Sequence, residues 1–558
     1  MATIKSKVLF ITTSPRTPAK MIPEIALLYN NFGGKKWDNS TQIEFMELLR
    51  EENFFNGEGA NDPAFSARDR INRAPQTLGF ITLKPHIDLT PAGKELISTT
   101  RTEEVFLRQL LKFQVPSPYH IPTAQAGKFW IKPYLEIFRL IRDFGSLSFD
   151  EVRLFALQML DYNDYDIIVK KIENFRKGRA LYTGTYKQYI YEITAREILS
   201  IYQEEIQRGD IKTRETNEKS LAKFISTKAQ NLRDYADACF RYLRATGVVA
   251  ISKSGKSISI IPEKLKEVDY FLANISRDPI HVDNMRRYLD YLGNAELPQL
   301  YTDNRGTLIE SLQQQFPEVH IDKDWSILHL KETLANCMES KKASIIEQQI
   351  DDIKDKKLYE DIDDVFTQIA SNNIYDASLM LEWNTWRAMT MIDGGHIKAN
   401  LKFDDFGLPM ATAQGNVADI VCEYEDFRTI VEVTLSTGQR QYEMEGEPVA
   451  RHLAKIKKTD YKESYCLFVA PSINPACISQ FYFLHKIPIE YYGGVSNIIP
   501  LELSIFRKML EDSYKATYTP SSQQLHKFFK EASKLASTAP NETIWYNGVK
   551  ELAINWLS

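Results

Sequence analysis

The sequence predicts a multidomain protein of mixed α+β and α/β class, in which a largely helical N-terminal region is followed by a helical linker and a C-terminal α/β domain. Three observations predict this class. The chain has 558 residues, enough for about three to four domains of ordinary size. Its first half twice shows the order helix, hairpin, helix, and its second half alternates apolar strands with helices. We expect the regions 1–270, 271–372 and 373–558.

Composition and cysteine content indicate an ordinary globular protein. With 43% hydrophobic and 26% charged residues, the chain is neither collagen-like nor disordered. The five cysteines form no C-x-x-C pair, and the N-terminus has too short an apolar run for a signal peptide or a membrane span. We therefore expect a reduced, soluble, cytoplasmic protein without membrane contact.

Charge is distributed unevenly along the chain, whose net charge is −5. Residues 1–270 carry 40 Lys and Arg against 33 Asp and Glu, whereas residues 271–558 carry 29 against 41. A basic first half suits contact with phosphate and an acidic second half suits metal binding. Two solvated surfaces of different charge would give the same numbers, so the charge distribution alone establishes neither phosphate contact nor metal binding.

The first segment with the order helix, hairpin, helix lies near residues 60–100. A short helical stretch, FSARDRINRA, precedes two strand-like runs, LGFITL and HIDLT. A second helix then begins at LTPAGKEL, where Thr90 is suited to cap the helix and Pro91 to occupy its first position. This order is typical of a winged helix-turn-helix subdomain.

The second such segment lies near residues 228–266. The helix KAQNLRDYADACFRYLRATG ends at Gly247 and is followed by the strands VVAISKS and KSISIIPEK on either side of Ser254-Gly255. Between the two segments, residues 128–206 have apolar clusters at helical spacing and predict further helices. The N-terminal region is therefore expected to hold two winged-helix-like subdomains in a helical setting.

Arginines lie on the first helix of each subdomain. Arginine can donate two hydrogen bonds to guanine O6 and N7, so such helices are typical readers of double-stranded DNA. The candidate DNA-binding residues are Ser66, Arg68, Arg70, Arg73, Arg233, Arg241 and Arg244. The competing interpretation is that Asp69, Asp234 and Asp237 pair with these arginines on an ordinary surface.

The second half begins with a helical connector and changes character at residue 374. Residues 303–372 are polar, acidic and helix-prone, and the helix SLMLEWNTWRAMTM follows them. Strand-like runs then appear at VADIVCEY, RTIVEVT and SYCLFVA, with the helix EPVARHLAKIKK between the second and third. Residues 500–558 are predicted to be mostly helical. Two adjacent strands, a helix and a return strand predict an α/β core.

Two acidic residues interrupt apolar strands of this core. Asp419 lies in VADIV and Glu432 in IVEVT, and an unpaired carboxylate is costly to bury. A divalent cation would offset this cost, and Mg²⁺ is usually held by one or two carboxylates while it keeps several waters. The spacing resembles the PD-(D/E)-x-K nuclease core, although Ala418 replaces the proline and Thr434 replaces the lysine.

Wider blocks of sequence carry a more specific resemblance. The blocks WNTW, GNVADIVCEYEDF, VEVTLSTGQRQYEMEGEPVARH and YCLFVAPSIN, together with FSARDR, LTPAGKEL, VFLRQLLKFQ and RDYADACFRYLRATG, occupy both halves of the chain. In this order they resemble the AlwI family of type IIS restriction endonucleases and their nicking relatives. The resemblance implies an N-terminal DNA-recognition region, a helical linker and a Mg²⁺-dependent PD-(D/E)-x-K cleavage domain that cuts at a fixed distance from a short asymmetric site.

The resemblance also implies site residues. The catalytic acids would be Glu382, Asp419, Glu432 and Glu445, with the metal held by Asp419, Glu432 and the backbone carbonyl of Val433. Glu382 would orient a water or a second ion, and Glu445 would take the place of the missing lysine. For Glu382 an exposed helical position, and for Glu445 a solvated loop, are the competing interpretations.

Other functions remain open at this point. Arg451 and His452 begin a basic helix that either contacts the scissile phosphates or is a plain amphipathic helix, and His452 is a less favoured metal ligand. A non-enzymatic winged-helix regulator and a structure-specific repair nuclease are the alternatives to a restriction enzyme. One active site per chain implies that double-strand cleavage needs a second catalytic domain, from another copy or from a separate small subunit.

Overall fold

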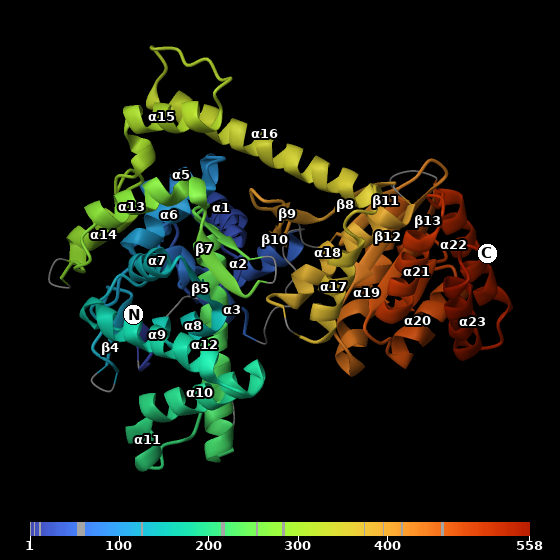
Figure 1. Ribbon diagram of the computed structural model, residues 1–558, viewed down its shortest axis with the longest axis horizontal. Helices are drawn as coiled ribbons and strands as arrows, with labels where there is room; N and C mark the ends of the chain where they lie inside the picture. Colours follow the sequence, from blue (N-terminus) through green and yellow to red (C-terminus); the bar gives the residue numbers. More distant parts are fainter. Residues whose placement is uncertain are drawn as a thin grey trace. The chain divides into compact units, whose positions relative to one another are not determined.

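The chain forms two compact units in the computed structural model. The model describes residues 2–4, 6–9, 13–52, 62–123, 126–213, 218–252, 255–281, 285–372, 374–393, 395–413, 417–458 and 462–558. The first unit contains most of the chain up to Cys337, and the second begins at Met338 and continues to Ser558. Figure 1 labels the elements of both units.

The first part of unit 1 contains the order of elements predicted for residues 60–100. Thr90 accepts a hydrogen bond from the amide of Gly93 at 3.0 Å, which confirms it as the cap of the predicted helix. Strands β2 and β3 form an antiparallel hairpin. The elements are α1 Met21–Phe32, α2 Asn39–Glu51, α3 Pro63–Ile71, α4 Ala74–Thr77, β2 Ile81–Thr82, β3 Asp88–Leu89, α5 Pro91–Ser98 and α6 Thr102–Lys112.

The second part of unit 1 contains the other predicted helix and hairpin. Helix α12 ends before Gly247, whose φ of +67° is the left-handed conformation that glycine adopts most readily. Strands β6 and β7 pair as predicted, and β5 adds a third strand that the sequence did not indicate. The elements are α7 Pro133–Phe144, β5 Ser146–Ser148, α8 Phe149–Leu154, α9 Tyr165–Leu181, α10 Tyr186–Ile201, α11 Gln203–Gln207, α12 Leu221–Arg244, β6 Val249–Ile251 and β7 Ser257–Ile260.

The segment predicted as one linker, 271–372, is divided between the two units. Its first helices pack within unit 1, because α13 contacts α7 and α14 contacts α5 and α6. Its last helix, α17, packs against α18 within unit 2. The helices are α13 Leu265–Asn274, α14 Met285–Gly293, α15 Arg305–Gln315, α16 Ile327–Lys354 and α17 Tyr359–Ala370. The unit boundary therefore lies inside the continuous helix α16.

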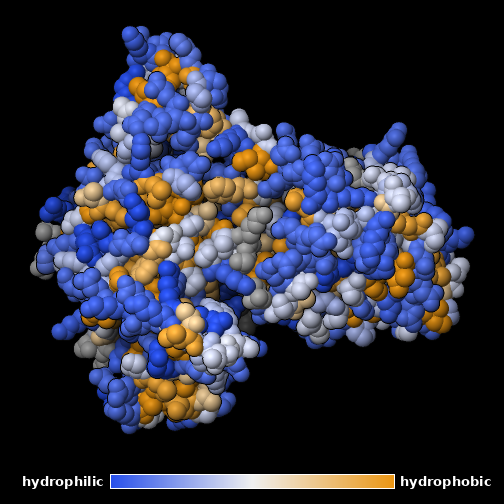
Figure 2. Space-filling model, in the orientation of Figure 1, coloured by the Kyte–Doolittle hydropathy of each residue, from blue (hydrophilic) through white to orange (hydrophobic). Residues whose placement is uncertain are grey.

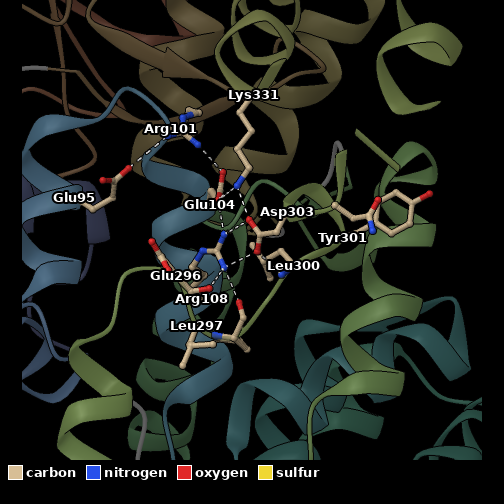
Figure 3. A network of polar contacts seen from close by, with 12 residues as sticks. Glu95, Arg101, Glu104, Arg108, Glu296, Leu297, Leu300, Tyr301, Asp303 and Lys331 are labelled. Atoms are coloured by element: carbon tan, nitrogen blue, oxygen red, sulfur yellow. Dashed lines mark hydrogen bonds and ion pairs between the residues drawn. The ribbon is translucent and has the colours of Figure 1, made fainter. Parts of the chain in front are cut away.

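A cluster of charged side chains fastens the first turns of α16 within unit 1, and we call Glu104, Arg108, Asp303 and Lys331 the α16 anchor. The Lys331 ammonium lies 2.6 Å from both Glu104 and Asp303. The Arg108 guanidinium donates to the same two carboxylates and to the carbonyl of Pro298 (Figure 3). Burial alone would raise the pKa of Glu104, but Lys331 and Arg108 outweigh it and lower that pKa.

Unit 2 is built on a five-stranded mixed sheet with the order β14-β13-β12-β11-β8. The pairs β8–β11 and β11–β12 are antiparallel, whereas β12–β13 and β13–β14 are parallel. The strands are β8 His396–Ala399, β11 Ile420–Glu423, β12 Phe427–Val433, β13 Glu463–Ala470 and β14 Ile498–Glu502, with a separate hairpin of β9 Leu401–Phe403 and β10 Pro409–Thr412. The strand-like runs predicted from sequence are β11, β12 and β13.

Helices cover this sheet and enclose the core of unit 2. Helices α18 and α21 contact each other and the sheet, and α19 and α20 do the same, while β12 and β13 are buried along almost their whole length. The helices are α18 Ala377–Asp393, α19 Gly438–Lys457, α20 Pro475–Lys486, α21 Leu503–Lys515, α22 Ser522–Thr538 and α23 Glu542–Ile554. The predicted helical tail is thus seen as α21 to α23.

The surface is mostly hydrophilic on the face drawn in Figure 2, where apolar residues gather over α10 and α11 near the lower end. All five cysteines are free thiols, and four of them are buried. Among the described residues, we find no helix long and apolar enough to cross a bilayer.

Candidate active site

The site is positioned by the pairing of β11 with β12 in unit 2. Ile420 pairs with Val431 in this antiparallel ladder, and the same register continued by one residue places Asp419 opposite Glu432. Side chains directly opposite each other in antiparallel strands lie on the same face of the sheet. Asp419 also accepts a hydrogen bond from the amide of Val433 at 2.9 Å. The two predicted metal-binding acids are therefore neighbours.

Burial and mutual repulsion make this pair of carboxylates electrostatically unfavourable. Burial is the main cause that raises the pKa of Asp419 well above its usual value, and the nearby Glu432 adds to the rise. The pKa of Glu432 is also raised well above its usual value, first by burial and then by Glu445 and Glu382. The structure thus brings the four predicted acids close enough to influence one another.

The other two acids lie on helices. One helix, α18, precedes strands β11 and β12 in the chain, and the other, α19, follows them. Glu382 lies on α18, is half-buried, and accepts a hydrogen bond from the Thr412 hydroxyl at 3.3 Å. Glu445 lies on α19, so the competing interpretation of a solvated loop is wrong. The Thr434 hydroxyl donates to Glu445, while burial raises the pKa of this carboxyl. The threonine that replaces the lysine therefore holds the acid proposed to act in its place.

His452 contacts one of the predicted metal-binding acids, Glu432, through one of its two ring nitrogens. Its Nδ1 lies 2.8 Å from Oε1 of Glu432. Burial, with smaller contributions from Arg451 and Lys455, lowers the pKa of His452 to about 4. The imidazole is therefore neutral near pH 7, and its Nδ1 shares a hydrogen bond with the Glu432 carboxyl. Within the described part of the chain, the buried Nε2 has no hydrogen-bond partner.

Sequence-based prediction favours no role for His452 beside the acids, although its spacing from Glu445 indicates one. Glu445 and His452 are seven residues apart, which is about two turns, so both lie on the same face of α19. Because α19 connects the parallel strands β12 and β13, that face must cover the sheet beside Glu432. The helix was predicted to begin only at Glu447, which left Glu445 outside it.

The donor set fits a hydrated divalent cation better than a closed protein cage. The described residues contain no group of three or more His, Cys, Asp or Glu side chains placed to share one ion. The pKa values of two adjacent acids are nevertheless raised by burial and by their acidic neighbours, and a bound cation would offset this repulsion. Mg²⁺ characteristically binds one or two carboxylates and retains waters, so Asp419, Glu432 and the Val433 carbonyl match its requirements.

The candidate DNA-binding residues of α3 make contacts within unit 1. Arg68 donates to the amide oxygen of Gln42 at 2.7 Å, and Arg70 pairs with the buried carboxylate of Glu24. Arg73 pairs with Asp69 one turn earlier, as the competing interpretation expected. Ser66 is half-buried at the edge of a surface pocket.

The candidates on α12 differ in how accessible they are. Arg241 pairs with Asp237 at 3.0 Å, and the guanidinium of Arg233 lies 6.0 Å from the centre of the Phe149 ring. Arg244 is only 9% exposed, which contradicts its expected role because a buried guanidinium cannot reach a duplex. Asp234 pairs with Arg16 rather than with an arginine of its own helix.

Comparison with known proteins identifies the family. The model of the AlwI restriction endonuclease family matches residues 76–509, which spans parts of both units and includes all four acids. The chain belongs to the AlwI restriction endonuclease family. It is therefore a nuclease that hydrolyses DNA, and a non-enzymatic regulator is excluded. Restriction endonucleases generally use divalent metal ions, in agreement with the donor set.

Solved structures are also similar to this AlwI-family chain. Among them is the small subunit of the heterodimeric restriction endonuclease R.BspD6I, with 25% sequence identity and a TM-score of 0.27. The similarity covers 37% of this chain and 95% of that subunit. No curated protein matched.

Proposed function

We propose that the chain is a type IIS restriction endonuclease, or the nicking subunit of one, that requires Mg²⁺. It would bind a short asymmetric site in double-stranded DNA and hydrolyse a phosphodiester at a fixed distance outside that site. The observation that carries the proposal is the Asp419–Glu432 pair, held opposite each other on β11 and β12 with raised pKa values. Family membership supports the nuclease activity itself.

The architecture of unit 2 supports a PD-(D/E)-x-K cleavage domain. Helix α18 precedes a meander of antiparallel strands, and α19 then crosses over to the parallel strand β13. Asp419 lies just before the start of β11, and Glu432 lies near the end of β12, so both acids are at the same end of this strand pair. In unit 1, the two helix-and-hairpin segments support a recognition region with winged-helix-like subdomains.

Some residues of the site would bind the metal, and others would position the metal ligands or accept a proton. When bound to Asp419, Glu432 and the Val433 carbonyl, Mg²⁺ would neutralise charge on the phosphate and lower the pKa of a water molecule. His452 would fix the orientation of the Glu432 carboxyl through its hydrogen bond to Oε1. Glu445, which the Thr434 hydroxyl contacts, would accept a proton where the lysine is missing.

A plasmid assay tests this proposal. Supercoiled DNA should be nicked or cut at fixed positions with Mg²⁺ and remain intact with a chelator. Asp419→Asn should abolish cleavage while duplex binding is kept, whereas Glu425→Gln, an exposed change in the turn between the same strands, should cut normally. Sequencing of the ends should place every break at one offset from a common sequence. Breaks that follow DNA shape instead would indicate a structure-specific nuclease.

The same assay separates nicking from double-strand cleavage. One active site per chain predicts that open circles accumulate before linear molecules. If linear product appears only at high protein concentration, a second copy supplies the other catalytic domain. If it never appears, the second strand requires a separate subunit.

A further inference from the structure

A surface pocket of about 410 Å³ lies beside helix α3 in unit 1. One wall is the segment 13–20, which precedes α1, and the other is helix α3 between Phe65 and Arg70. Residues with hydroxyl groups lie in both walls, namely Thr13, Ser14, Thr17 and Ser66. Hydroxyl groups are regular donors to the phosphate oxygens of DNA.

The segment 13–20 is held between the two helices for which DNA contacts are predicted. The carbonyl of Ser14 accepts a hydrogen bond from the amide of Ala74, the first residue of α4, which follows α3, at 3.3 Å. The carbonyl of Pro15 accepts one from the Tyr242 hydroxyl of α12 at 3.0 Å. The segment is therefore hydrogen-bonded both to α4 and to α12.

The charges at the pocket are predominantly positive. Arg16, Lys20 and Arg70 line it together with one acid, Asp69, whose charge is already paired with Arg73. The charge of Arg70 is largely matched by the buried Glu24. Arg16 and Lys20 are thus the cations that the pocket can offer to a ligand.

These two cations are accessible. The Arg16 side chain is 64% exposed, and its ion pair with Asp234 is long at 3.4 Å. Lys20 is also exposed, and its ammonium forms no ion pair with any described residue. Neither was among the residues that the sequence singled out, because the segment has no helical or strand periodicity.

We propose that this pocket binds a backbone phosphate of duplex DNA, with Arg16 and Lys20 as the main cations and the hydroxyl groups as additional donors. The inference rests on the proposed function and adds a contact between the two predicted DNA-reading helices. Of the proposed donors only Arg16 offers a fixed, bidentate pattern for a base edge, whereas a phosphate accepts hydrogen bonds from Arg16, from Lys20 and from hydroxyl groups alike. The contact would therefore position the duplex without selecting sequence.

Salt dependence of binding tests the proposal without cleavage. Affinity of a fluorescein-labelled duplex is measured by anisotropy in a chelating buffer at several chloride concentrations. For each phosphate contact removed, the negative slope of log affinity against log salt should become shallower by about 0.9. We expect this change for Arg16→Gln and for Lys20→Gln, with affinity about 3- to 10-fold lower near 0.1 M salt. The loss should be equal for duplexes of unrelated sequence.

Matched variants separate charge from structure. Arg16→Lys should keep the wild-type slope, because a phosphate contact requires the charge and not the planar guanidinium. Lys177→Gln, an exposed lysine of α9 outside the pocket, should also keep it. Each variant is checked by thermal unfolding, which exposed substitutions should leave unchanged.

Three outcomes would overturn the inference. Wild-type slopes in both glutamine variants would mean that the pocket makes no phosphate contact. A change in sequence preference without a change in slope would mean that Arg16 reads a base. Displacement of duplex by inorganic phosphate at matched ionic strength, more strongly from the wild type than from the variants, would assign the pocket to a free anion. If the wild type binds no duplex at all, the proposed function fails first.

Discussion

His452 illustrates how a single residue can act on this site through another. It is a positioning residue, since its Nδ1 contacts Glu432 and its low pKa keeps the ring neutral. We predict that His452→Ala lowers the cleavage rate by about 10- to 100-fold, the usual cost of losing a group that orients a metal ligand. Cleavage measured against Mg²⁺ concentration should show half-maximal activity at a higher concentration.

A conservative change provides the control for this prediction. His452→Asn retains a side-chain N–H donor and should recover part of the lost Mg²⁺ response. A loss of activity with an unchanged Mg²⁺ requirement would contradict the positioning role and indicate damage to packing alone.

The pKa shifts of the acids predict an unusual pH dependence of stability. Because the pKa values of Asp419 and Glu432 are raised, the folded protein retains protons that the unfolded chain releases above about pH 4. The stability due to this protonation is complete below that pH and is lost as the pH rises through the raised values. His452, with its lowered pKa, has the opposite sign and loses stability as the pH falls below about 6.5.

We therefore predict that Asp419→Asn stabilises the metal-free protein at pH 8 while it abolishes cleavage. Relief of repulsion should raise the melting temperature by about 2–4 °C per kcal/mol, and the gain should shrink toward pH 5. Mg²⁺ should stabilise the wild type and not the variant. Thermal unfolding with and without Mg²⁺ measures both effects, and a variant that melts below the wild type at pH 8 would refute the prediction.

The sequence could identify some of these residues and not others, for physical reasons. Asp419 and Glu432 were predictable because a carboxylate within an apolar strand demands compensation. Glu445 is among the predicted site acids, but its acidic neighbours look solvated, and the predicted helix begins only at Glu447, whereas α19 begins at Gly438 and includes it. Arg244 was misjudged because a basic helix face can turn inward, and sequence alone does not fix the orientation of a helix.

At the scale of elements, the stability of the first turns of α16 depends on the α16 anchor in unit 1. The Lys331 side chain is 10% exposed and bridges Glu104 and Asp303, which Arg108 also contacts. We predict that Lys331→Met destabilises unit 1 by about 1–3 kcal/mol, the cost of charge-assisted hydrogen bonds. The first turns of α16 should then exchange amide hydrogens faster and be cleaved more readily by protease.

An exposed lysine on the same helix supplies the control. Lys341→Met should leave exchange and proteolysis of α16 unchanged. Equal protection in the Lys331 and Lys341 variants would show that α16 is held by apolar packing instead of the anchor.

The elements that sequence predicted share one property. Strands β12 and β13 are long and apolar, the shorter β11 is mostly apolar, and α18 has bulky apolar residues, so their own residues specify them. Strands β5, β8 and β14 were missed, and each lies at an edge of its sheet. Such strands form where a neighbouring strand supplies hydrogen-bond partners, which no local pattern reveals.

At the scale of the whole molecule, two units with separate cores should unfold separately. We predict two calorimetric transitions, since each unit is large enough to be cooperative. Asp419→Asn should shift only one of them and Lys331→Met only the other. A single transition displaced by both variants would mean that the units unfold as one.

The position of the unit boundary has a practical consequence for making hybrid enzymes. Because the chain passes from one unit to the other within α16, no loop is available at which to join parts of two relatives. Each residue added to the middle of this helix would turn everything beyond it by about 100° and advance it by about 1.5 Å. Swapped halves therefore need equal helix lengths, or spacers chosen as whole numbers of turns.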